Sequence, residues 1–314
     1  MNAGRLFGIG WRTVPRLPDA LGRAIFDVVA LAVWARRGGG VQRLERNLAR
    51  ARPDASPREL RRLSRAGMRS YMRYYCEAFQ LPGWDAELVA AKVRAVGATP
   101  LLEDLADGRA VILVLGHLGN WDLSGAWAAR ALAPVVTVAE RLEPAELFDQ
   151  YVAFRESLGI SVIPLDRGTN VFRALVGHAK RGGVVVPLLA DRDLSATGVV
   201  VDLLGEPARV AAGPAALTLA TGARLYPTRI TYERLRGRRR RAARGPWGTV
   251  LDFAPAVEVP EGLTRADAVA AISQAWVDSV AEAIRTKPED WHMLQRVFVA
   301  DLDPARAPTA DVTP

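Results

Sequence analysis

The chain has 314 residues, 50% of them apolar, which is enough for one large α/β domain or two small ones with a sizeable buried core. Its formal charge of +8 and pI of about 10.2 favour anionic partners, namely lipid headgroups, phosphorylated cofactors, acidic carrier proteins or nucleic acid. The single cysteine, Cys76, excludes an intramolecular disulfide and a cysteine-based zinc site.

The first part of the chain, residues 1–85, is predicted to be helical. Its longest apolar stretch, "AIFDVVALAVWA" (24–35), is shorter than the roughly 20 residues that a membrane span requires, and it contains Asp27. Basic residues flank it, so it is either a packing helix or a helix lying in a membrane interface, and the sequence leaves both open. A second helix is expected to start at "SPREL", because Ser56, the following proline and Glu59 form a capping box.

Further along, from about Val93, short β-branched runs such as "AVILVLGH" and "GVVVPLLADRD" alternate with helical stretches. Continuous apolar strands alternating with helices are typical of an α/β fold with a central, mainly parallel β-sheet flanked by helices. We therefore expect an α/β core over residues 86–300. The composition of residues 301–314 predicts a disordered tail.

One strongly basic stretch, "RLRGRRRRAARGPWG" (234–248), lies between two predicted strands. It is either a solvated, flexible hairpin loop or a basic finger for anionic lipid headgroups or RNA. Because it lacks interleaved aromatic residues, it is a poor platform for stacking nucleotide bases. We favour membrane contact over the absence of a role.

Polar side chains follow three of the predicted strands. The first strand is followed by "GHLGNWD", the second ends at Glu140, and a later one is followed by "ADRD". The residues concerned are His117, Asn120, Asp122, Glu140, Asp191, Arg192 and Asp193. Strand ends of one parallel sheet face the same edge, so these groups are expected to converge there.

Histidine is the side chain best suited to act as a general base near neutral pH, and a carboxylate on its second nitrogen fixes the tautomer. Asp122 is expected in the first turn of the helix after His117, where the helix dipole favours a carboxylate. The spacing fits equally well a buried structural histidine followed by a helix N-terminal aspartate. The spacing of His117 and Asp122 by itself leaves both interpretations open.

Other chemistries have less support. The chain contains no nucleophile elbow, P-loop, H-E-x-x-H or G-x-G-x-x-G motif. Its three histidines are scattered, so we expect no metal site. His178 is interpreted as a surface or capping residue near the end of a helix, and His292 as structural.

The motifs together resemble a known family. "LGHLGNWD" is similar to the H-x-x-x-x-D/E block of glycerolipid and lipid A acyltransferases, and "LLGEPARVAAG", "FRESLGISVIPL" and "KPEDWHMLQRVF" resemble further blocks of the lipid A biosynthesis (lauroyl/myristoyl) acyltransferase family. The likeness covers nearly the whole chain. Two departures are the missing aromatic before the glycine of "LLGEP" and the basic stretch 234–248, and both leave the choice of acceptor open.

Within this family the residues most resemble the actinobacterial branch that acylates phosphatidylinositol mannosides. The resemblance implies transfer of an acyl chain, typically palmitoyl, from acyl-CoA to the 6-hydroxyl of a mannose, with no cofactor beyond this co-substrate. The implied partners are acyl-CoA, a mannosylated phosphatidylinositol and an anionic membrane surface, without nucleic acid. The implied location is peripheral, on the cytoplasmic face of the cell membrane.

The resemblance also implies residue roles. His117 would be the base, with Asp191 its acid partner slightly ahead of Asp122, which would hold the helix start. Glu140 and Arg155 would position the acceptor, although Arg155 could equally form a structural ion pair. Arg192 and Asp193 would brace the site. Backbone N–H groups near Gly119 and Asn120 are candidates for stabilising the oxyanion.

Two alternatives remain at this stage. A related transferase could take its acyl chain from an acyl-carrier protein or acylate a different glycolipid or phospholipid. A non-enzymatic basic protein that binds membranes or RNA would explain the charge, but it would leave the polar strand ends without a purpose.

Overall fold

The computed structural model describes residues 3–140, 145–165, 170–193 and 198–302. Within these ranges, a seven-stranded sheet has the order β1-β9-β8-β2-β5-β3-β4. The strands are β1 (Val93–Val96), β2 (Val111–Leu115), β3 (Val135–Glu140), β4 (Ile160–Leu165), β5 (Val185–Leu189), β8 (Arg224–Arg234) and β9 (Trp247–Phe253). All neighbours pair in parallel except β8 and β9, which confirms the predicted mainly parallel α/β fold.

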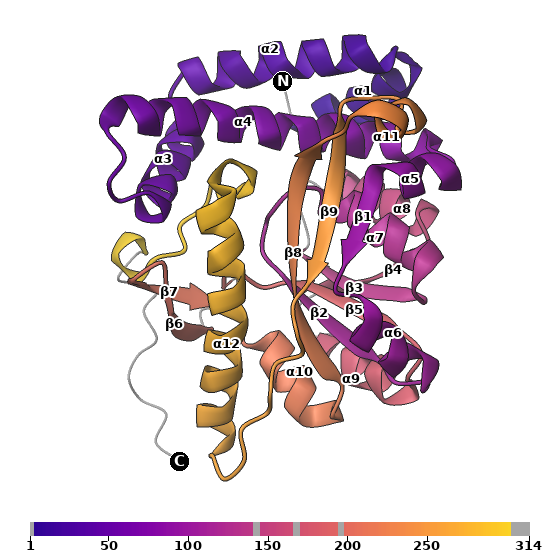
Figure 1. Cartoon of the computed structure of the whole chain (residues 1–314), viewed down its shortest axis with the longest axis vertical. Helices are drawn as coiled ribbons and strands as arrows, with labels where there is room; N and C mark the ends of the chain where they lie inside the picture. Colours follow the sequence, from indigo (N-terminus) through magenta and orange to yellow (C-terminus); the bar gives the residue numbers. More distant parts are fainter. Residues whose placement is uncertain (1–2, 141–144, 166–169, 194–197, 303–314) are drawn as a thin grey trace.

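Helices cover both faces of this sheet (Figure 1). They are α5 (Ala86–Lys92), α6 (Thr99–Ala106), α7 (Trp121–Ala131), α8 (Ala145–Ser157), α9 (Val171–Arg181), α10 (Gly213–Thr221) and α12 (Arg265–Thr286). The central strand β2 is buried along its whole length. Its Ile112 and Val114 belong to the core shared with α9, α10 and α12, whereas Leu113 and Leu115 belong to the core shared with α5–α8. A strand covered on both faces needs apolar residues at every position, which explains the run "VILVL".

A separate ribbon of two antiparallel strands, β6 (Val199–Leu203) and β7 (Glu206–Val210), packs beside α12. The basic stretch 234–248 does connect two antiparallel strands, as a hairpin would. The connection contains a short helix, α11 (Gly237–Ala242), and Ala243 after it is fully buried. The expectation of a wholly flexible loop is therefore corrected.

Four helices precede the sheet: α1 (Ala3–Thr13), α2 (Asp19–Ala35), α3 (Gly39–Ala51) and α4 (Pro57–Gln80). The predicted capping box starts α4, since Ser56 Oγ accepts from Glu59 N and the Glu59 carboxylate accepts from Ser56 N. Helix α2 lies alongside α4 at one end of the molecule (Figure 1). These helices give the sheet an additional layer at that end.

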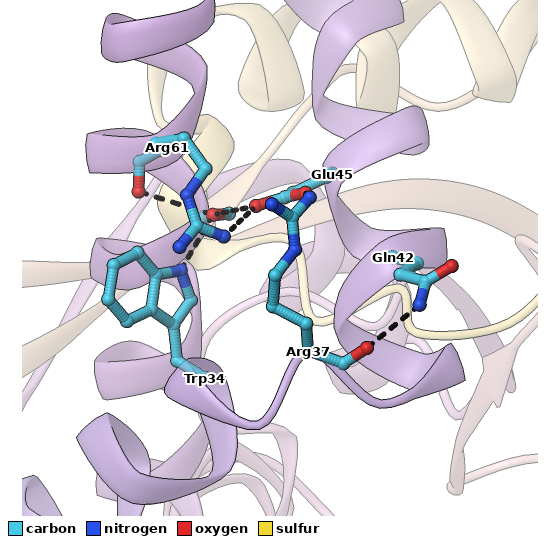
Figure 2. Close-up of polar contacts among 6 residues, drawn as sticks. Trp34, Arg37, Gln42, Glu45 and Arg61 are labelled. Atoms are coloured by element: carbon cyan, nitrogen blue, oxygen red, sulfur yellow. Dashed lines mark hydrogen bonds and ion pairs between the residues drawn. The ribbon is translucent and has the colours of Figure 1, made fainter.

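A polar cluster fixes α2, α3 and α4 to one another (Figure 2). The Glu45 carboxylate accepts hydrogen bonds from Arg37 at 3.0 Å, Arg61 at 2.9 Å and Ser64 at 3.0 Å. Trp34 Nε1 donates to Ser64 Oγ, and the Arg61 guanidinium lies over the Trp34 ring. A nearly buried carboxylate needs such compensation, so this cluster specifies how the three helices meet.

None of the described helices combines the length and apolarity that crossing a membrane would require. Helix α2 nevertheless exposes an apolar stripe at i, i+4, i+7 and i+8, formed by Leu21, Ile25, Val28 and Val29. Gly22 and Ala30 of the same helix are buried, and α2 packs on α4. At the other end of the chain, Asp301 closes a short 3₁₀ turn, and the rest of the predicted tail, from residue 303, lies outside the described residues.

Candidate active site

The strand register places His117 beside Asp191. Leu115 of β2 pairs with Leu189 of β5, and each polar residue follows its strand end by two positions. The loops stay in register because Ala190 N–H donates to the Leu115 carbonyl. His117 Nδ1 lies 2.5 Å from Asp191 Oδ1. The two residues, 74 positions apart, therefore form a side-chain pair at the carboxyl edge of the sheet.

Three hydrogen bonds hold the buried Asp191 carboxylate. Besides the imidazole, Asp191 Oδ2 accepts from His117 N at 2.9 Å and from Trp291 Nε1 at 3.0 Å. Burial alone would raise the pKa of Asp191, but the charge of a protonated His117 and these hydrogen bonds outweigh burial and lower the pKa. Since the carboxylate is ionised, the imidazole keeps its hydrogen on Nδ1. This leaves the lone pair of Nε2 to accept a proton.

A C-terminal segment fixes the loop that carries His117. Trp291 bridges to Leu118, His292 N–H donates to the His117 carbonyl at 2.8 Å, and Gly119 N–H donates to the Asp290 carbonyl at 2.9 Å. Gly119 has a φ of 57°, and a Cβ there would meet the Ile230 carbonyl oxygen at 2.8 Å, so glycine is required. Because its N–H is already occupied, Gly119 is not the oxyanion donor suggested by the sequence.

Asp122 has different partners. Its buried carboxylate accepts from Tyr74 Oη at 2.7 Å and from Arg155 Nε at 3.0 Å. The geometry thus answers the question left open by the sequence: Asp191 pairs with His117, and Asp122 pairs with Arg155. This ion pair joins the start of α7 to α8.

The Asp122–Arg155 pair leads to a prediction about stability. Asp122→Ala should lower the free energy of unfolding by about 3–5 kcal/mol, because it leaves the Arg155 charge buried without its partner. Urea denaturation measures the loss. The double variant Asp122→Leu/Arg155→Met should recover part of it, since no buried charge then remains. A double variant less stable than Asp122→Ala would contradict this interpretation of the pair.

Two of the polar residues that follow the strands, Asn120 and Asp193, are not among the described residues that line the cavity beside His117. Asn120 is fully buried as the N-cap of α7; its Oδ1 accepts from Leu123 N, and its Nδ2 donates to Glu77 at 2.7 Å. The Asn120 side chain thus caps α7 and joins it to α4, and Asp193, which was expected to brace the site, is bonded to the backbone of Gly198.

The cavity beside His117 has a volume of about 390 Å³. Glu140 and Arg192, which are 2.9 Å apart and form an ion pair, line it together with His117, Asp122 and Arg155. The rest of the wall is largely apolar and aromatic: Tyr71, Tyr74, Tyr75, Leu115, Trp121, Val138, Phe148, Tyr151, Ile160, Leu165, Pro187 and Leu189. A few polar groups on an otherwise apolar wall suit a substrate with a polar head and a hydrocarbon chain.

Sequence reasoning missed the tyrosines of α4 as part of this cavity. Tyr71, Tyr74 and Tyr75 belong to the amphipathic pattern of α4, which predicts core packing. In the structure the Tyr71 and Tyr75 hydroxyls are hydrogen-bonded to each other, and Tyr74 stacks near Trp121. A sequence signal for a packed stripe cannot distinguish a filled core from a cavity wall.

His292 is a second histidine in the cavity wall. It is 5% exposed, and its Nε2 lies 3.0 Å from Ser70 Oγ, which donates its own hydrogen to Asp290 Oδ1. Nε2 therefore carries the hydrogen, and Nδ1 is a buried acceptor without a hydrogen-bond partner among the described residues. Burial, with the positive charge of Arg73 and that of His117 when it is protonated, lowers the pKa of His292 well below its ordinary value. The ring is neutral and offers a lone pair.

Asp290 makes the stability of the protein depend on pH. Burial raises its pKa from 3.8 to about 6, although Ser70 Oγ and Tyr232 N donate to its carboxylate. A raised folded-state pKa favours the protonated form, so its contribution to stability is complete below pH 3.8 and is lost as the pH rises through about 6.

The unfolding free energy of the wild type relative to Asp290→Asn should thus fall by about 3 kcal/mol from acid to neutral pH, since each pKa unit is worth about 1.4 kcal/mol. Urea unfolding of both proteins across this range checks the sign. A difference that is constant or rises with pH would refute the assignment.

Within the described ranges, no group of three or more histidine, cysteine or acidic side chains is arranged to hold a metal ion. The residues that converge at the sheet edge are instead a base with its carboxylate, an ion pair at the cavity rim, and an apolar wall.

Comparison with known proteins matches residues 4–299 to a family model described as bacterial lipid A biosynthesis acyltransferase. A phosphatidylinositol mannoside acyltransferase of Mycolicibacterium smegmatis is 38% identical over 302 residues, covering 96% of this chain and 92% of the relative. A protein of the same name from Mycobacterium tuberculosis is 39% identical over 305 residues, covering 96% and 90%. The resemblance drawn from the sequence motifs is confirmed.

Proposed function

Since the chain belongs to the bacterial lipid A biosynthesis acyltransferase family and is an acyltransferase, we propose that it acylates phosphatidylinositol mannosides. The acyl chain is palmitoyl, the donor is acyl-CoA, and the accepting group is the 6-hydroxyl of a mannose. The observation that carries this proposal is the pair of His117 with the buried Asp191 at the edge of a cavity with a polar rim and an apolar wall.

The reaction follows from the state of the imidazole. His117 Nε2 accepts the proton of the mannose hydroxyl as its oxygen attacks the thioester carbonyl carbon. The tetrahedral intermediate collapses with cleavage of the C–S bond, and the imidazolium returns the proton to the departing thiolate. Asp191 stabilises the imidazolium between these two steps, so atoms and charges balance without a further reactant.

Direct transfer also agrees with the state of the only cysteine. Cys76 is fully buried, and burial raises the pKa of its thiol to about 12. A thiol held protonated inside the core is a poor nucleophile. Because Cys76 does not take the acyl chain, His117 acts directly on the acceptor hydroxyl.

Binding of the acceptor is assigned to the polar rim of the cavity, which is formed by Glu140 and Arg192. Glu140 accepts and Arg192 donates hydrogen bonds at one side of the cavity, and such charged groups pair well with sugar hydroxyls. Arg155, already bonded to Asp122, contributes its remaining guanidinium hydrogens.

The same proposal includes a peripheral position on the cytoplasmic face of the cell membrane. The exposed apolar stripe of α2 supports contact with lipid chains, and the net charge of +8 supports attraction to anionic headgroups. Vesicle sedimentation with and without anionic lipid measures this association. Replacing Val28 and Val29 by serine should weaken it.

The test of function is a comparison of donors and acceptors. Purified protein is incubated with palmitoyl-CoA or palmitoyl-acyl-carrier protein, and with phosphatidylinositol mannosides or phosphatidylinositol lacking mannose. The expected product carries one added palmitoyl ester on mannose, forms with the CoA donor, and requires the mannose. Preference for the carrier protein, or acylation of the lipid without mannose, would overturn the assignment of donor or acceptor respectively.

A further inference from the structure

A second cavity, of about 500 Å³, lies between α2, α4 and the β8–β9 hairpin. It shares no lining residue with the cavity beside His117. We name it the arginine cavity after the side chains that line it: Arg23, Arg69, Arg73 and Arg234, with Lys287. The walls of the two cavities meet at Ser70 and His292, since Ser70 lines this cavity, His292 lines the other, and the two are hydrogen-bonded.

Three of these cations have no carboxylate within ion-pair distance among the described residues: Arg73, Arg234 and Lys287. The other two are partly compensated. Arg69 forms a bidentate pair with Asp27, and Arg23 lies 4.0 Å from Asp19. Arg73 still acts on the Asp290 carboxylate through its charge, without a direct ion pair. A wall with such an excess of positive charge attracts an anion.

The indole of Trp247 pre-organises two of the three. Arg73 Cζ lies 3.6 Å and Arg234 Cζ 4.3 Å from the centroid of the Trp247 ring, so both guanidiniums rest on the same side chain. Arg73 also lies over the ring of the buried Tyr232. Stacking fixes the planes of the guanidiniums and leaves their edge N–H groups for a ligand, an arrangement suited to phosphate oxygens.

Carboxylates also line the arginine cavity, and they limit what it can bind. Asp27 is neutralised by Arg69, and the carboxylate of Asp290 is occupied by Ser70 and Tyr232. Glu289 is the third. Five cations against three acids leave an excess of positive charge. The exposed arginines of the neighbouring α11 extend the positive field beyond the cavity.

We propose that the arginine cavity is a binding site for a phosphate-bearing ligand, held by Arg73, Arg234 and Lys287. Phosphate reaches this protein from two sources under the proposed reaction, the phosphodiester of an inositol lipid headgroup and the phosphates of CoA. The chemistry of the cavity fits both. The choice of these two ligands rests on the proposed function, but the test measures binding without turnover, so its failure is distinguishable from a failure of acyl transfer.

Calorimetric titration of the full-length protein with glycerophosphoinositol, with CoA and with inorganic phosphate tests the site. The variant Arg73→Gln/Arg234→Gln removes two charges from the cavity. The matched control Arg240→Gln/Arg241→Gln removes two charges from α11, which does not line it. Circular dichroism establishes that both are folded. Lys287→Gln is a second cavity variant that keeps the Trp247 stack intact.

Binding of glycerophosphoinositol or CoA should weaken at least about ten-fold in the double cavity variant, and about three-fold in Lys287→Gln, while the control stays within two-fold. The probe that responds identifies the source of the phosphate. Equal weakening in the cavity and control variants would show only a diffuse positive field and would overturn the proposal. So would the absence of saturable binding of any probe to the wild type.

Discussion

His117→Ala is expected to lower kcat for acyl transfer by about 10³-fold, with little change in the KM for either substrate. Removing the imidazole removes the group that accepts the hydroxyl proton, while the cavity and its polar rim remain. The backbone of residue 117 keeps its place because its N–H donates to Asp191 and its carbonyl accepts from His292 N–H.

His178→Ala is the matched control, since it removes a histidine from α9 that does not line the cavity. Its kcat should stay within about two-fold of the wild type. Initial rates by mass spectrometry of the lipid product give both values. Full activity in His117→Ala would contradict the assignment of His117 as the general base.

Asp191→Asn is expected to lower kcat by roughly 10²–10⁴-fold, although it changes only one atom. His117 N and Trp291 Nε1 both donate to Asp191 Oδ2, so the amide oxygen takes that position. The amide nitrogen then faces His117 Nδ1 and donates to it. This forces the imidazole hydrogen onto Nε2, where the base needs a lone pair, and it also removes the charge that stabilises the imidazolium.

The matched control for this variant is Asp193→Asn, two residues further along and bonded to Gly198 N. It should keep kcat within about three-fold. The proton positions are checked by ¹⁵N NMR of histidine-labelled protein, which should show the hydrogen of His117 on Nδ1 in the wild type and on Nε2 in Asp191→Asn. The same tautomer in both would contradict the explanation even if activity fell.

The fold could be predicted from the sequence because its strands are continuous apolar runs. "VILVL" is buried on both faces, and such a run between helices indicates a parallel sheet. The general rule that parallel strand ends face one edge allowed His117 to pair with Asp191 or with Asp122, and only the family resemblance placed Asp191 slightly ahead. The difference lies in the register of β2 on β5, which joins residues 74 positions apart.

The roles of the other site residues depend on contacts between distant parts of the chain, which no local sequence pattern encodes. Asn120 has the residue type of a substrate-binding side chain, yet Glu77 from α4 occupies its amide. Gly119 N–H has the position of an oxyanion donor, yet the Asp290 carbonyl accepts it. His292 was interpreted as structural, and its burial agrees. Its unpartnered Nδ1 at the cavity wall emerges only once Ser70 and Asp290 are placed around it.

The account rests on direct transfer of the acyl chain from thioester to hydroxyl under the action of His117 and Asp191. The measurement that tests it most directly is a rapid-quench single turnover with radiolabelled palmitoyl-CoA, in which the label on CoA, protein and lipid is followed over time. The label should pass from CoA to the phosphatidylinositol mannoside without residing on the protein, and no labelled protein should form when the acceptor is omitted. A covalent acyl-protein that forms from palmitoyl-CoA alone and then transfers its label to the lipid would contradict the account.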